Sequence, residues 1–343
     1  MSARRIAIFF AIVGLAIAIT VVVLALERLD VLTLPWRRAT QTAIQVAVPP
    51  ILADWATASA REFDGQVTVI PVHGLSAVGQ FARMDAPLRP HAWIPEATFV
   101  AAIARDQGLS YETVGQSVAA ADLAWGAFSS RAAVLSGRFG TLDWQAVHQA
   151  AVSHGWAELG GNADWGNFKL ILASPTHSAE GLAALLSAAA AYRNRPDLAY
   201  DDVTDEAFLQ WLRAIVTSVP NFGTLGPQPA ESVATRGPSV GDAGLLAAAA
   251  WNRSQVRLDR WETFVVVAPQ FTVRLDYPYL LRSDLDPAER ETARRFGAFL
   301  LGRATQLADS GFAQATVSAV QVNVDTQAVL ALLRWAERER IGQ

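Results

Sequence analysis

Thr176, His177 and Ser178 stand together where an apolar segment gives way to an alanine-rich stretch that is typical of a helix. Ser178 is a favourable N-cap residue, and Glu180 follows in the first turn of the expected helix. The backbone N–H groups of such a turn point outward and, together with the helix dipole, favour an anion or a polar ligand. The same residues also suit a capped helix that binds nothing, so both interpretations stay open.

A hydrolase interpretation would use Ser178 as the nucleophile, His177 as its base, and Asp164 or Glu180 as the acid that orients the base. Side chains adjacent in sequence rarely face each other, and no G-x-S-x-G elbow or phosphate-binding glycine loop occurs. The 5 histidines lack the H-E-x-x-H and H-x-H spacings of catalytic zinc sites. We therefore predict that the chain is not an enzyme and needs no metal and no cofactor.

Composition narrows the classes of protein further. The chain has 343 residues, of which 52% are hydrophobic and 17% charged, and is long enough for two domains with ordinary cores. Its net charge is -4, and its 28 Lys and Arg residues form no basic tract, which argues against nucleic acid as a partner. The absence of cysteine excludes disulfides, thiolate metal sites and a cysteine nucleophile.

The N-terminus predicts a membrane anchor. Arg4 and Arg5 precede an uncharged run, Ile6 to Leu26, that is long enough to cross the hydrocarbon core of a bilayer. The run ends without the small residues that signal peptidase prefers, so residues 1–30 are predicted to be an uncleaved signal anchor, with cleavage as the alternative. The charge distribution places the remaining chain outside the cell or in the periplasm, and residues 6–26 as a single-pass transmembrane helix.

The body of the chain is predicted to be α/β, with apolar strands alternating with helices in two lobes and a parallel sheet covered on both faces. One lobe is expected from residues 42–122 plus 265–343 and the other from 123–264, with crossings near Ala121 and Val265. The predicted strands are 42–48, 66–72, 91–95, 131–137, 168–174 and 262–273; the main predicted helices are 51–63, 76–84, 97–104, 143–156, 285–312 and 325–340.

Ligands of open α/β sheets bind beyond the carboxyl ends of the strands, where helices begin. In this sequence that rule selects residues 49–51, 94–96, 129–131 and 174–178, which include Ile51, Glu96, Ser129 and Ser130. We expect these segments, with the turn at Ser178, to meet in a cleft between the lobes.

The middle of the chain resembles bacterial extracellular solute-binding proteins, most closely the subgroup associated with von Willebrand factor type A domains. That subgroup shows a W-x-x-L helix, a W-G-x-x-K segment before a strand, and D-P-x-x-S-x-x-G at a helix start. The segment 236–243, which includes Ser239, matches a G-P-S-x-x-D pattern, and the similarity continues to the last long helices. The positions that match the first three motifs are Trp144, Trp165, Gly166, Lys169, Pro175, Ser178 and Gly181.

The resemblance implies a type II periplasmic-binding-protein-like fold with two lobes, a hinge and a cleft. It implies that a small polar or anionic solute is held by backbone N–H groups and hydroxyls, with no chemical reaction. This sequence departs from the pattern: Ser174 replaces the usual aspartate, and Pro49 and Ile51 stand where anion-binding members carry small hydroxyl residues. The predicted ligand contacts are Thr176, His177, Ser178, Ser129, Ser130, Ile51, Glu96 and Ser239.

The apolar first loop leaves a second hypothesis open. The same fold with a degenerate cleft would serve as an extracellular interaction module that binds another membrane or surface protein, such as one with a von Willebrand factor type A domain. The sequence names neither the ligand nor the partner.

Overall fold

The computed structural model describes residues 42–312 and 319–342. The predicted anchor at residues 6–26 lies outside these ranges. Within them, no helix combines the length and apolar character needed to cross a bilayer.

The first sheet contains the predicted strands near the start of the body. β1 (Ile44–Val48) pairs in parallel with β2 (Val67–Pro71) and β3 (Ala92–Trp93). β10 (Leu280–Arg282) inserts antiparallel between β3 and β4 (Tyr111–Thr113), which gives the order β2-β1-β3-β10-β4. The predicted all-parallel arrangement is therefore wrong for β10, because the chain re-enters this sheet after completing the second one.

The second sheet has the order β6-β7-β5-β8, formed by β6 (Leu170–Ile171), β7 (Ala243–Ala247), β5 (Leu123–Phe128) and β8 (Phe264–Val267). The β6–β7 pair is parallel, whereas β5 runs antiparallel to both of its neighbours, β7 and β8. The predicted strand at 131–137 is wrong: these residues belong to α5 (Ser129–Phe139), and the strand lies just before it.

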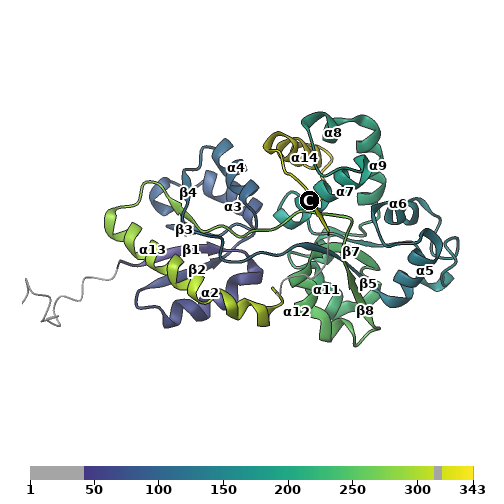
Figure 1. The fold of residues 1–343 in the computed structure, drawn as a ribbon, viewed down its shortest axis with the longest axis horizontal. Coiled ribbons are helices and arrows are strands. Elements are labelled where there is room, and N and C mark those ends of the chain that lie inside the picture. The colour runs from purple at the N-terminus through teal and green to yellow at the C-terminus, as the bar shows by residue number, and fades with distance from the viewer. Residues whose placement is uncertain (1–41, 313–318, 343) are drawn as a thin grey trace, which may run out of the picture. The chain divides into compact units, whose positions relative to one another are not determined.

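Helices cover both faces of each sheet (Figure 1). On the first sheet, α2 (Pro50–Glu62) and α13 (Pro287–Gly302) pack on one face, and α3 (Gly74–Ala82) and α4 (Thr98–Asp106) lie on the other. On the second sheet, α12 (Ala248–Leu258) packs against β5, β7 and β8. The remaining helices are α6 (Trp144–Val152), α7 (Ala179–Arg193), α8 (Tyr200–Thr204), α9 (Glu206–Thr217), α10 (Phe222–Leu225), α11 (Pro229–Arg236) and α14 (Thr326–Arg338), with short 3₁₀ turns at Ala86–Leu88, Ala163–Trp165, Gly237–Ser239 and Ala304–Ser310.

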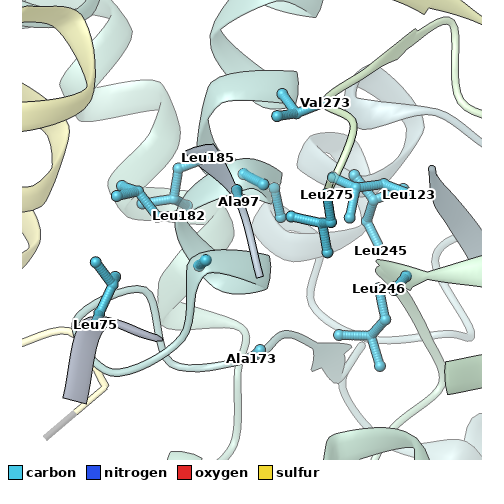
Figure 2. Close-up of a cluster of buried hydrophobic side chains, with 14 of the residues drawn as sticks. Leu75, Ala97, Leu123, Ala173, Leu182, Leu185, Leu245, Leu246, Val273 and Leu275 are labelled. Atoms are coloured by element: carbon cyan, nitrogen blue, oxygen red, sulfur yellow. The ribbon is translucent and has the colours of Figure 1, made fainter. Parts of the chain in front are cut away.

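The alanine-rich helix α7 is buried on nearly all sides, from Ala179 to Ala190. A helix that is apolar all round belongs in a core, and small side chains let neighbouring elements approach closely. At Gly181 an added Cβ would lie 2.2 Å from the carbonyl oxygen of Ala173, so glycine is required where α7 leaves the preceding turn. Figure 2 shows Leu182 and Leu185 of this helix in a buried cluster with side chains from β5, β7 and the segment at residues 273–275.

Two extended segments connect the sheets and run beside each other. Ala121 and Leu275 exchange backbone hydrogen bonds of 2.8 and 2.9 Å, and the Val118 amide donates to the Tyr277 carbonyl over 3.1 Å. We call residues 273–279 the crossing segment.

The chain does not cross back from the second lobe to the first near Val265, as was predicted. β8 belongs to the second sheet, and the chain returns only after β9 (Phe271–Thr272), which pairs with β11 (Val320–Gln321). The C-terminal helix α14 also departs from the predicted lobe assignment: its apolar face packs on α7 and α8 of the second lobe and on α4 of the first.

Candidate functional site

A pocket with a cavity volume of about 50 Å³ lies where the carboxyl ends of strands from both sheets meet. From the first sheet, Ile51 follows β1, His73 follows β2 and Glu96 follows β3. From the second sheet, Ser178 and Glu180 stand at the start of α7, beyond β6. The other lining residues are Pro49, Pro227, Gln228, Pro229, Ala230, Glu231, Leu246, Ala250, Arg253, Leu275 and Tyr277.

His73 and Glu96 form a partly buried pair on the side of the first sheet. The His73 Nδ1 atom lies 3.0 Å from Glu96 Oε1, and the Gly74 amide donates to Glu96 Oε2 over 2.7 Å. Burial alone would lower the pKa of His73, but the hydrogen bond and the charge of Glu96 outweigh burial and raise it. Contact with Glu96 therefore favours the protonated form of the His73 imidazole.

Gly74 makes this contact sterically feasible. A Cβ atom at this position would lie 2.3 Å from Glu96 Oε2, so any other residue would push the carboxylate away from the start of α3.

Glu180 is the acidic group on the opposite side of the pocket. Its Oε1 atom accepts the Ala247 amide over 2.5 Å, and no described residue forms a hydrogen bond with its Oε2 atom. Burial raises the pKa of Glu180 to about 7, against the pull of the Ala247 amide and of His73 in the other direction. The carboxyl thus titrates in the physiological range.

Tyr277, in the crossing segment, completes the pocket. The residue is 1% exposed, and its hydroxyl has no hydrogen-bond partner among the residues that the structure describes. Its φ of 39° is in the left-handed region, which residues other than glycine seldom adopt, and its amide donates to the Glu96 carbonyl over 3.2 Å. Burial and the charges of Glu180 and Glu96 raise the pKa of Tyr277 well above its usual value, so the hydroxyl stays protonated.

The predicted turn at 176–178 divides between two environments. Ser178 lines the pocket, and its Oγ atom caps α7 by accepting the Glu180 amide over 3.2 Å. Thr176 and His177 are not among the lining residues. The Thr176 hydroxyl donates to the Ile341 carbonyl over 3.2 Å, and the His177 Nδ1 atom lies 2.9 Å from Ser174 Oγ, so this part of the turn holds the C-terminal segment.

The geometry gives no support to the hydrolase interpretation. The His177 ring contacts the hydroxyls of Ser174 and Thr176, not that of Ser178, so no base faces the proposed nucleophile. Among the described residues, no cluster of three or more acidic and histidine side chains is arranged to hold a metal ion.

The other predicted hydroxyl contacts lie elsewhere in the fold and do not line the pocket. Ser129 and Ser130 donate their hydroxyls to Glu262, each over 2.9 Å, so the start of α5 is already occupied by a carboxylate from the same chain. Ser239 is exposed in a 3₁₀ turn and donates to the Arg236 carbonyl over 2.7 Å. Of the eight predicted contacts, the pocket therefore brings together Ile51, Glu96 and Ser178.

Several residues behind the sequence resemblance form a buried polar cluster instead of a ligand site. Asp242 is fully buried and accepts the Lys169 amide over 2.8 Å, the Trp156 indole over 3.2 Å and the Arg131 guanidinium over 3.4 Å. The Arg131 guanidinium stacks 3.9 Å from the centre of the Trp165 ring. Burial raises the pKa of Asp242 despite these cationic and donor neighbours. The W-G-x-x-K and G-P-S-x-x-D motifs thus join two segments of the second lobe.

Six polar lining residues were not predicted as ligand contacts: His73, Glu180, Gln228, Glu231, Arg253 and Tyr277. His73 follows a predicted strand, so the rule that selected Glu96 would also have selected it. Arg253 lies in mid-helix, and Tyr277 lies in a segment whose place depends on contacts distant in sequence, so neither carries a local signal.

Comparison with known proteins identifies the fold. No protein-family model matches the sequence, and no curated protein matches it significantly. Among solved structures, the periplasmic binding protein AfuA from Actinobacillus pleuropneumoniae, with fructose-6-phosphate bound, is 10% identical with a TM-score of 0.57, over 86% of this chain and 98% of that chain. A periplasmic thiamin binding protein is 9% identical with a TM-score of 0.59, over 88% of this chain and 96% of that chain.

The apo ferric ion-binding protein A from Pasteurella haemolytica is 9% identical with a TM-score of 0.57, over 88% of this chain and 98% of that chain. At such low identity, the likeness concerns the fold alone. The chain therefore has the two-lobe α/β fold of the type II periplasmic binding proteins.

Proposed function

We propose that the chain is a membrane-anchored, extracytoplasmic solute-binding protein that holds a small polar ligand in the pocket between its sheets. The observation that carries the proposal is the pocket itself, which lies at the carboxyl ends of strands from both sheets and is lined by Tyr277, a buried residue whose hydroxyl has no partner among the described residues. Buried polar groups are normally hydrogen-bonded, so an unpartnered hydroxyl facing a cavity suits a ligand. The uncharged run from Ile6 to Leu26 supports anchoring, and the structural neighbours support the binding role.

A thermal-shift screen of the full-length chain against amines, sugars, amino acids and anions tests this proposal. A ligand at a hundred times its dissociation constant adds about 2.7 kcal/mol to the free energy of unfolding, which is readily measured. We expect one chemical class to stabilise the protein. The absence of a shift from every class would contradict solute binding.

The alternative is an interaction module that binds another membrane or surface protein, including one with a von Willebrand factor type A domain. The apolar Pro49 and Ile51 at the pocket favour it, because they supply no hydrogen-bond donor where a ligand would need one. Failure of the screen would favour this alternative.

A further inference from the structure

The charges around the pocket are balanced by ion pairs with one exception. Glu96 pairs with His73 over 3.0 Å, and Arg253 pairs with Asp54 over 2.9 Å. Glu231 pairs with Arg257. Glu180 has no ion-pair partner among the described residues, so the pocket carries one uncompensated carboxylate whenever this group is ionised.

Hydrogen-bonding capacity shows the same imbalance. The Oε2 atom of Glu180 accepts nothing from the described residues, and the hydroxyl of Tyr277, a residue that is 1% exposed, has no hydrogen-bond partner among them. These two groups are close enough for the charge of Glu180 to shift the pKa of Tyr277. The Tyr277 hydroxyl can donate or accept, and the buried Nε2 atom of His73 also has no partner among the described residues. Of these three unpartnered lining groups, the ionised Glu180 carboxylate alone can only accept.

The rest of the lining is largely hydrophobic. Pro49, Ile51, Pro227, Leu246 and Leu275 surround the acceptors and would pack against an apolar body. We propose that the ligand is a small organic amine whose ammonium group donates hydrogen bonds to the Glu180 carboxylate and the Tyr277 oxygen. Its apolar part lies against the hydrophobic lining. This inference rests on the proposed function.

The same geometry opposes an anion, although the start of α7 was predicted to attract one. Glu180 lies in the first turn of α7, so the helix already has a carboxylate of its own at its positive end. An anionic ligand would also face Glu96. A quaternary ammonium would supply charge without an N–H donor and would leave the Glu180 and Tyr277 oxygens unpaired.

The test uses three probes of similar size and different charge, butylamine, butanol and butyrate, with the full-length chain at neutral pH. Calorimetric titration and thermal shift give their relative affinities. We expect butylamine to bind at least about tenfold more tightly than butanol, as charge-assisted hydrogen bonds do, and butyrate to bind more weakly than both. Tetramethylammonium should bind more weakly than butylamine.

Two variants test whether Glu180 causes the preference for butylamine over butanol. Glu180→Gln should remove most of the amine preference while leaving the affinity for butanol within about twofold, because the amide keeps the size and loses the charge. Glu231→Gln removes the same charge from a lining residue that is already paired, and should change the amine preference much less. Circular dichroism and the melting temperature establish that both variants fold.

Three results would overturn the proposal: butyrate binding as tightly as butylamine, an unchanged amine preference in Glu180→Gln, or binding of none of the probes. If another class of solute stabilises the chain in the broader screen, the proposed function stands and only the ligand class is wrong.

Discussion

Arg253 of α12 donates a hydrogen bond of 2.8 Å to the backbone carbonyl of Ile51, a residue in the first turn of α2 that lines the pocket. Its guanidinium also pairs with Asp54 over 2.9 Å. Because α12 packs on the second sheet and α2 on the first, this side chain connects the two lobes beside the pocket. The start of α3 adds a second connection, since the Ser76 amide donates to the His177 carbonyl over 3.1 Å.

Arg253→Ala should weaken ligand binding by roughly threefold to tenfold, because it removes one hydrogen bond and one exposed ion pair between α12 and α2 beside the pocket. Small-angle X-ray scattering of the ligand-bound protein should show a larger radius of gyration in the variant. Arg260→Ala removes an exposed arginine that makes no hydrogen bond or ion pair with α2, among the residues that the structure describes, and is the matched control. Equal affinities in the two variants would show that Arg253 does not hold the lobes together.

The stability of the protein should fall as the pH rises from about 4.5 to about 7. In this window folded Glu180 keeps a proton that the unfolded chain has lost, because burial raises its pKa to about 7 from a usual value of 4.5. The loss is on the order of 3 kcal/mol when the whole window is crossed. His73 acts in the same direction: its pKa is raised by Glu96, so its contribution is complete below 6.5 and is lost as pH rises through its folded pKa.

Urea unfolding at a series of pH values checks this expectation. Glu180→Gln should reduce the fall in stability between about pH 4.5 and 7, because it removes the carboxyl whose pKa burial raises to about 7. His91 and His148, whose pKa values burial lowers, remain in both proteins and contribute equally to the two curves. Identical slopes in the wild type and the variant would exclude Glu180 as the titrating group.

Asp242→Ala should destabilise the protein by about 3 to 5 kcal/mol, because it leaves the Lys169 amide and the Trp156 indole without an acceptor and the buried Arg131 with Glu262 as its remaining anionic partner. Asp242→Asn should cost less, since its amide oxygen can still accept the Lys169 amide. Asp164→Asn, at an exposed site in the same lobe, is the control. Chemical denaturation measures all three, and a loss no greater than that of the control would contradict a structural role for Asp242.

Ser178→Ala should reduce stability by about 1 kcal/mol through loss of the helix cap. Because Ser178 also lines the pocket, ligand affinity should fall by about fivefold as one hydrogen bond is lost. Thr176→Ala, two residues away and outside the pocket, should leave the affinity unchanged. An unchanged affinity in Ser178→Ala would make this residue a cap alone.

The fold class followed from the alternation of apolar strands and helices, because both lobes bury their strands and leave a strong local pattern. The comparisons confirm the two-lobe fold. The strand Leu123–Phe128 was missed and α5 was predicted as a strand because short apolar runs are ambiguous between the two. Position 126 in that strand requires glycine, because an added Cβ would lie 2.5 Å from the Trp251 ring. This constraint arises from tertiary packing and leaves no local pattern in the sequence.

The candidate site was partly predictable for the same reason. The rule that ligands bind beyond strand ends selected Ile51, Glu96 and Ser178, which the pocket does contain. The rule also selected Ser129 and Ser130, because the sequence cannot show that Glu262 occupies their hydroxyls. The sequence could not predict Tyr277 as a lining residue, since its position depends on pairing between the crossing segment and the chain near Ala121.

Calorimetric titration of a pocket-filling variant is the most direct test of solute binding between the lobes. Ala250→Phe places a ring in the pocket from α12, whereas Ala58→Phe adds the same ring on the exposed face of α2. With the ligand found by the screen, we expect the wild type and Ala58→Phe to bind with equal affinity, and Ala250→Phe to bind at least about tenfold more weakly, because a filled site excludes the ligand. Wild-type affinity in a folded Ala250→Phe variant would contradict the account.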